Sequence, residues 1–67
     1  MNATDFKPGD RVLYVPGHAH GNQRHPDCER GVVSSTNSVN VFVRYYRRGG
    51  ELRETPQSTS LEDLVML

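Results

Sequence analysis

The fold is decided by the stretch Val39-Asn40-Val41-Phe42-Val43-Arg44-Tyr45-Tyr46-Arg47, the longest run rich in β-branched and aromatic residues. Such residues favour strands, and successive side chains of a strand point to opposite faces. One face would carry Val39, Val41, Val43 and Tyr45, and the other face Asn40, Phe42, Arg44 and Tyr46. The stretch therefore predicts a strand with one face toward a core and an arginine between two aromatic rings on the other.

Shorter strands are expected on both sides of this stretch. Two precede it, at 11–15 and 31–35, and the first follows a turn at 6–10. A hairpin turn at 48–51, with both glycines at positive φ, leads to a returning strand at 52–55 that Pro56 ends. Ser60 is expected to cap one short helical turn, and a last strand is expected at 65–67. The sequence therefore predicts an all-β fold of about five short antiparallel strands, with a long first loop and one helical turn before the last strand.

Length and composition bound the protein further. The chain has 67 residues and its eight basic and eight acidic residues cancel. We expect a single domain over 1–67, without a global field toward nucleic acid or membrane. One cysteine allows no disulfide within the chain, and no signal peptide or apolar span of ~20 residues is found, so a cytoplasmic protein is expected. The thin apolar content, 34% of residues, suits a monomer or a weak homodimer.

Three motifs resemble those of a known class of small barrel. The stretch Phe6-Lys7-Pro8-Gly9-Asp10-Arg11-Val12-Leu13-Tyr14 is similar to the first strand of bacterial SH3-like domains of the Tudor, KOW and CarD types, in which Gly-Asp-x-Val opens the barrel. Gly31-x-Val33 and Glu62-Asp63-Leu64 resemble their second strand and last turn. The whole chain also resembles small uncharacterised phage and prophage proteins with a similar loop of histidines and a cysteine. The resemblance implies a small SH3-like barrel that serves as a binding module for nucleic acid or another protein.

All three histidines and the only cysteine lie in the loop between the first two predicted strands. They are His18, His20, His25 and Cys28. Imidazole and thiolate are the usual ligands of structural zinc, and four such donors suffice for a closed tetrahedral site. All four fall within 11 residues, however, in an order that matches none of the common zinc spacings. Zinc is therefore an optional rather than a required cofactor.

The alternative for this loop needs no metal. In it, Asp27 and Glu29 pair with Arg24 or Arg30, the histidine rings cap backbone groups, and the cysteine is a small buried hydrophobic residue. Both interpretations of the loop stay open from the sequence.

The predicted ligand surface lies on the outer face of the longest strand and the hairpin after it. It comprises Phe42, Arg44, Tyr46, Arg47 and Arg48. Single-stranded nucleic acid binds such surfaces, because bases stack on aromatic rings and guanidinium groups pair with phosphates. Aromatic residues and arginine also dominate protein interfaces, so a protein partner such as a transcription complex remains an alternative, with the chain as adaptor or inhibitor.

Catalysis is not expected. No nucleophile motif and no glycine-rich loop leading into a helix is present. Cys28 follows His25 closely, but acidic residues flank it, whereas a reactive thiolate needs an electropositive setting. The sequence therefore predicts a non-enzymatic binding module whose groove lies between the first long loop and the face of Phe42, Arg44 and Tyr46.

Overall fold

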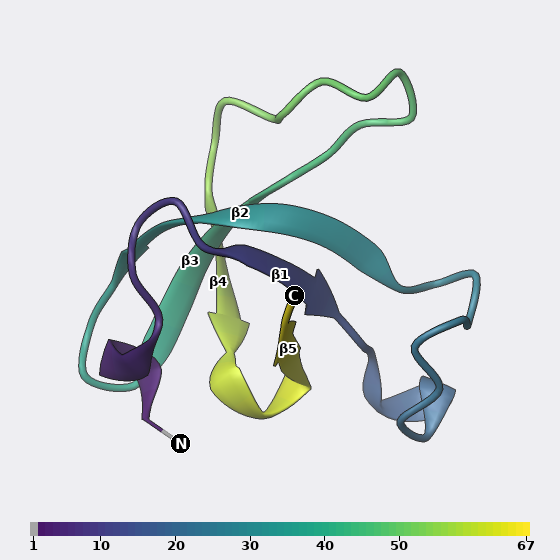
Figure 1. Ribbon diagram of the computed structural model, residues 1–67, viewed down its shortest axis with the longest axis horizontal. Coiled ribbons are helices and arrows are strands. Elements are labelled where there is room, and N and C mark those ends of the chain that lie inside the picture. Colours follow the sequence, from purple (N-terminus) through teal and green to yellow (C-terminus); the bar gives the residue numbers. More distant parts are fainter. Residues whose placement is uncertain (1) are drawn as a thin grey trace.

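Five strands form one antiparallel sheet in the computed structural model, which describes residues 2–67 (Figure 1). The strands are β1 (Arg11–Tyr14), β2 (Glu29–Thr36), β3 (Asn40–Tyr45), β4 (Gln57–Ser60) and β5 (Leu64–Met66). Three short 3₁₀ turns accompany them: η1 (Ala3–Asp5), η2 (Gly17–Ala19) and η3 (Leu61–Asp63). The order in the sheet is β4-β3-β2-β1-β5. The prediction of an all-β fold of five antiparallel strands is confirmed.

The two edge strands of the sheet are linked by the short turn η3. It joins the end of β4 directly to the start of β5, and the backbone N–H of Val15, just after β1, donates to the carbonyl of Asp63 at 2.8 Å. Figure 1 shows β4 running down to this turn and β5 rising from it toward the C-terminus. The arrangement is compatible with a small β-barrel-like domain. The long first loop and the helical turn before the last strand are both confirmed.

The alternation predicted for the longest strand is present in β3. Val41 and Val43 are fully buried, and Tyr45 is 5% exposed. Val39 was predicted to lie on this face, but it precedes the strand and is 64% exposed. The side chain of Asn37 turns the chain at this point, its Oδ1 accepting the backbone N–H of Val39 at 2.9 Å. This local hydrogen bond competes with the sheet ladder and delays the start of the strand.

The returning strand is where the sequence prediction fails. Residues 52–55 form no strand, and Leu52 makes only an isolated bridge with Tyr46. The ladder resumes beyond Pro56, which has no backbone N–H to donate, and β4 pairs with the first four residues of β3. The predicted turn at 48–51 also differs, since only Gly50 has a positive φ, of 88°. The result is an extended hairpin loop over 46–56 in place of a tight hairpin.

The polar strand β4 is held by one buried hydrogen bond. Thr59 is buried, and its Oγ1 lies 2.7 Å from the hydroxyl of Tyr45. Because the Thr59 hydroxyl donates to the carbonyl of Gln57, the tyrosine is the donor of this bond. Burial raises the pKa of Tyr45, which keeps the phenol protonated. Ser60 occupies the cap position of η3 as predicted, but its side chain makes no capping hydrogen bond.

The core has two parts, one on each face of the sheet. The main cluster contains Ala3, Phe6, Val12, Val33, Val41, Val43, Tyr45 and Leu64, with Tyr14 and Leu61 packed against it. Its N-terminal members come from η1 and the residue after it, a segment for which the sequence predicts no helical turn. The second cluster contains Leu13, Val15 and Ala19, with Cys28 and Val65 against it. This second cluster holds the long β1–β2 loop against the outer face of β1.

Close packing between β2 and β3 depends on a glycine. Gly31 lies opposite Tyr45, and a Cβ at Gly31 would come within 2.8 Å of the Arg44 carbonyl and 2.5 Å of a Val43 methyl. The first of these contacts is with backbone in the middle of a ladder, which cannot move freely. The register of the same two strands shifts between Val33 and Ser35, and such a bulge bends and twists the strand.

Membrane insertion by a helix is not supported. Within residues 2–67, no helix has the length and apolar character to cross a membrane.

We predict that Gly31→Ala lowers the free energy of unfolding by about 1–3 kcal/mol, the usual cost of overpacking a core. Gly49→Ala is the matched control, because nothing lies within 4 Å of its Cβ position and its φ is not positive. Urea denaturation followed by circular dichroism measures both. Equal stability of the two variants would contradict the proposed close contact.

Candidate functional site

A groove with arginine walls lies between the β1–β2 loop and the hairpin loop. Its volume is about 500 Å³. The lining residues are Pro26, Cys28, Glu29, Arg30, Tyr46, Arg47, Arg48 and Arg53. In Figure 1 the two loops lie on either side of the start of β2. The groove therefore combines two segments that are more than 15 residues apart in the chain.

A second hollow adjoins this groove. It is lined by Arg11, Arg30, Gly31, Tyr46, Gly50 and Leu67. Arg30 and Tyr46 line both hollows, so the two adjoin at these residues and are treated as one surface. We call this surface the arginine groove. It contains five of the seven arginines of the chain and a single acidic side chain, Glu29.

The register of the sheet brings these arginines together. Arg11 of β1 pairs with Val32 of β2, which pairs with Arg44 of β3. Two residues before Val32, the carbonyl of Arg30 accepts the backbone N–H of Tyr46 at 3.0 Å. Residues two apart in a strand share a face. The outer face, opposite the main core, therefore carries Arg11, Arg30, Arg44 and Tyr46.

The guanidinium groups of the groove are not neutralised by neighbouring carboxylates. In the described part of the chain, no arginine comes within 4.0 Å of an acidic oxygen, and the ion pairs present both involve histidine. Arg30, Arg47, Arg48 and Arg53 are all exposed. Their hydrogen-bond donors are therefore available to an anion.

The structure places three of the five predicted ligand-binding residues in the arginine groove: Tyr46, Arg47 and Arg48. Phe42 and Arg44 share the outer face of β3 but do not line the groove, and the phenylalanine is half-buried. The predicted set did not include Arg53 of the hairpin loop, nor Arg11 and Arg30. The alternation within β1 and β2 was the available evidence, but it does not give the register that sets these arginines beside Tyr46.

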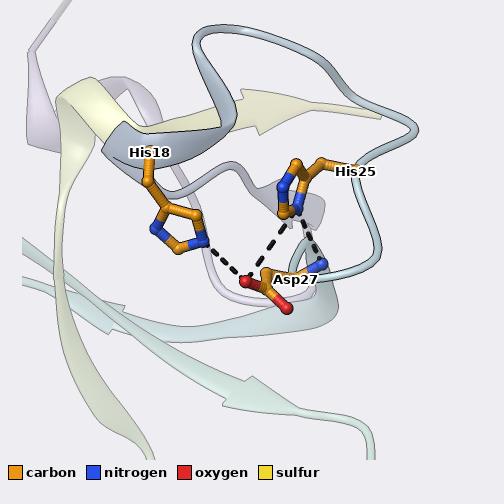
Figure 2. Close-up of side chains that lie close together, drawn as sticks. All are labelled: His18, His25 and Asp27. Carbon is orange, nitrogen blue, oxygen red and sulfur yellow. Dashed lines mark hydrogen bonds and ion pairs between the residues drawn. The ribbon is translucent and has the colours of Figure 1, made fainter.

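The β1–β2 loop contains a second cluster, formed by His18, His25 and Asp27 (Figure 2). Nε2 of His18 lies 2.6 Å from Oδ2 of Asp27, and Nδ1 of His25 lies 4.0 Å from the same oxygen. Nδ1 of His25 also accepts the backbone N–H of Asp27 at 3.0 Å. The two imidazole rings meet edge to face, with centroids 5.2 Å apart. One nitrogen of each ring and one carboxylate oxygen all lie within 4.8 Å of one another.

The other two predicted metal ligands lie outside this cluster. His20 is exposed at the end of η2 and adopts a left-handed conformation with φ of 51°. Cys28 packs against the second core cluster, and its thiol donates to the carbonyl of Asn22 at 3.3 Å. The structure thus brings together two of the four predicted donors, and it adds Asp27, which the sequence had offered only as a partner for arginine.

The alternative for the loop is partly confirmed. Cys28 is a partly buried residue against the core, and His25 caps the backbone N–H of Asp27. The predicted ion pairs with Arg24 or Arg30 are wrong within the described residues, because Asp27 pairs with His18 instead. The pairing follows from the loop geometry, since consecutive turns bring residues 18 and 27 together.

Backbone hydrogen bonds between residues three apart define those turns. The N–H groups of Ala19, Asn22, His25 and Cys28 donate to the carbonyls three residues earlier. Each bond closes a turn, so the loop has a regular course although it contains no long element. The thiol bond to Asn22 joins the last turn to the second one. The histidines are therefore presented from an ordered frame.

We predict that His18→Ala raises the pKa of Asp27 toward its usual value. The hydrogen bond from His18 now holds the pKa of this carboxyl below its usual range. Since the folded pKa lies below the unfolded one, the stabilisation is present above the unfolded pKa and is lost as the pH falls through the folded pKa. Carboxyl ¹³C NMR during an acid titration measures the pKa, and His20→Ala should leave it unchanged. An unaltered Asp27 titration in His18→Ala would refute the pairing in solution.

Comparison with known proteins assigns no family to the chain. No protein-family model matches it, and no curated protein or solved structure matches it either. The evidence for function is the chemistry of the arginine groove and of the histidine–aspartate cluster beside it.

Proposed function

We propose that this protein is a non-enzymatic binding module that binds single-stranded nucleic acid in the arginine groove. The observation that carries the proposal is the gathering of Arg11, Arg30, Arg47, Arg48 and Arg53 in two hollows that share Tyr46, with Glu29 as the single acidic side chain among them. Planar guanidinium groups bind phosphate oxygens in a bidentate manner.

Tyr46 is the reason for proposing single-stranded rather than double-stranded nucleic acid as the ligand. Tyr46 is 39% exposed and lies where the two hollows meet. A base can stack on such a ring only when it is not already stacked within a duplex. Arginines on both sides of the ring would then contact the phosphates before and after the stacked base.

The charge distribution supports an anionic ligand. The formal net charge is zero, so long-range attraction is weak and binding would depend on the local field. Several unpaired guanidinium groups around one groove repel one another, and a phosphate backbone relieves this repulsion. Binding of this kind releases counterions and weakens steeply with salt.

The biological setting is a broader part of the proposal. An SH3-like module of phage or prophage origin that acts on nucleic acid or a transcription complex would fit the motif resemblance and the groove together. The single cysteine favours the cytoplasm. We propose neither catalysis nor a required cofactor for this role, and a single domain that is monomeric or weakly dimeric suffices for it.

We predict that a short single-stranded oligonucleotide binds with an affinity that falls with salt, and that Arg47→Gln reduces the slope of log K against log salt by about 0.7, the value of one phosphate contact. Arg24→Gln is the control, because Arg24 is exposed but does not line the groove. Fluorescence anisotropy at several salt concentrations gives both slopes. If Arg24→Gln changes the slope as much as Arg47→Gln, the groove is not the site.

We predict that Tyr46→Leu weakens oligonucleotide binding by about 1–3 kcal/mol, the contribution of one stacked base. The apolar replacement retains part of the packing of the half-exposed ring, and circular dichroism checks the fold. Leu52→Ala is the control for general loss of apolar surface, since Leu52 forms a bridge with Tyr46 but does not line the groove. Absence of any oligonucleotide binding at low salt would leave a protein partner as the better explanation of the exposed aromatic and arginine residues.

A further inference from the structure

We propose that His18, His25 and Asp27 form a binding site for a divalent transition-metal ion, with zinc as its expected occupant. The donor set differs from the four residues that the sequence suggests, because Asp27 belongs to it and neither His20 nor Cys28 does. None of these three residues lines the arginine groove, so the metal proposal does not rest on the proposed nucleic-acid binding.

The three donors suit zinc by type and number. Two imidazole nitrogens and one carboxylate oxygen are found in open zinc sites, where solvent or an external ligand completes the coordination. Imidazole favours zinc and its transition-metal neighbours over magnesium or calcium. A cluster with two nitrogen donors therefore selects a metal of this class.

The spacing of the donors fits a small displacement onto a metal. Zinc bonds to nitrogen and oxygen are ~2.0–2.2 Å long, so tetrahedral donors lie roughly 3.3–3.5 Å apart. The His18–Asp27 distance of 2.6 Å is shorter than this and the His25–Asp27 distance of 4.0 Å is longer. Side-chain movements of less than an ångström would bring these two distances to that spacing, and the His18 and Asp27 side chains are about 60% exposed and can rotate. The donor set as a whole spans up to 4.8 Å, so it must contract further around an ion.

The protonation of the cluster also suits a metal. Nδ1 of His25 accepts the backbone N–H of Asp27, so it is unprotonated, and this hydrogen bond must break before its lone pair can bind an ion. The short contact between His18 and Asp27 is a hydrogen bond whose proton a cation would replace. Figure 2 shows both rings directed toward the same carboxylate from different turns of the loop.

The surroundings leave a position open for the remaining ligands. A hollow of about 420 Å³ adjoins the cluster and is lined by Tyr14, Pro16, His18, Pro26, Asp27 and Glu29. Water molecules can reach a bound ion through this hollow. Glu29 shares it but does not belong to the group of donors within 4.8 Å, so we assign it no role as a ligand.

A bound ion would join η2 to the turn at 25–27 and so close the β1–β2 loop. Pro26 lines both this hollow and the arginine groove. The metal would therefore stiffen one wall of the groove without contacting its arginines.

The test uses the complete chain prepared without a histidine tag and freed of metal by a chelator. Titration with Co²⁺ followed by absorption, and then displacement by Zn²⁺, should show one site with d–d bands but no thiolate-to-cobalt charge-transfer band. His18→Ala and Asp27→Asn should each lower the affinity about tenfold or more. His20→Ala should leave it unchanged, because His20 is an exposed histidine of the same loop outside the cluster.

Three results would overturn the assignment. The first is no binding of Co²⁺ or Zn²⁺ at millimolar concentration by a chain that circular dichroism shows to be folded. The second is an equal loss of affinity in His20→Ala and His18→Ala. The third is a charge-transfer band that Cys28→Ser abolishes, which would assign the ion to the thiolate instead of Asp27.

Discussion

The pairing of β2 with β1 on one side and with β3 on the other is the constraint on which the rest of this structure depends. It fixes which residues face the core and which face outward on three strands at once. Gly31 permits the close approach of β2 and β3, and the bulge after Val33 bends the longer strand around the core. A shift of one residue in this pairing would exchange the two faces of a strand, burying Arg30 and exposing Val33.

The long β1–β2 loop depends on the same pairing. Its two ends are held by Tyr14 and Glu29, which lie opposite each other in the ladder. Between them, Ala19 and Cys28 pack on the outer face of β1, and several turns give the remainder a defined path. The loop thus forms one wall of the arginine groove and also carries the histidine–aspartate cluster. Pro26 lies between these two sites and lines both hollows.

For an anionic ligand, the distribution of charge over the surface matters more than the net charge of the chain. The chain is formally neutral, yet most of its arginines surround one groove and a single acidic side chain lies among them. Charges separated by more than the Debye length of ~8–10 Å are largely screened at physiological salt. Acidic residues beyond this length contribute little to the field that a ligand meets in the groove, whereas Glu51 and Glu54, which adjoin the lining residues Gly50 and Arg53 in the chain, reduce that field. The local arrangement of the arginines, rather than the net charge of the chain, makes this groove positively charged.

The amino-acid sequence by itself determined the all-β class, the alternation of Val41, Val43 and Tyr45, and the helical turn before the last strand. These features depend on steric preferences and side-chain periodicity within a few residues. The sequence also identified the hairpin arginines and the histidine-rich loop as candidate sites. It misplaced the fourth strand, because Pro56 could end a strand or precede one.

Only the tertiary structure decided how these segments meet. Strand register set Arg11 and Arg30 beside Tyr46, and the turns of the β1–β2 loop joined His18 and His25 to Asp27 while directing Cys28 into the second core cluster. The register is set by contacts between residues far apart in the chain, and the course of the loop by several turns acting together and by packing on β1. The preferences of single residues and their immediate neighbours encode neither.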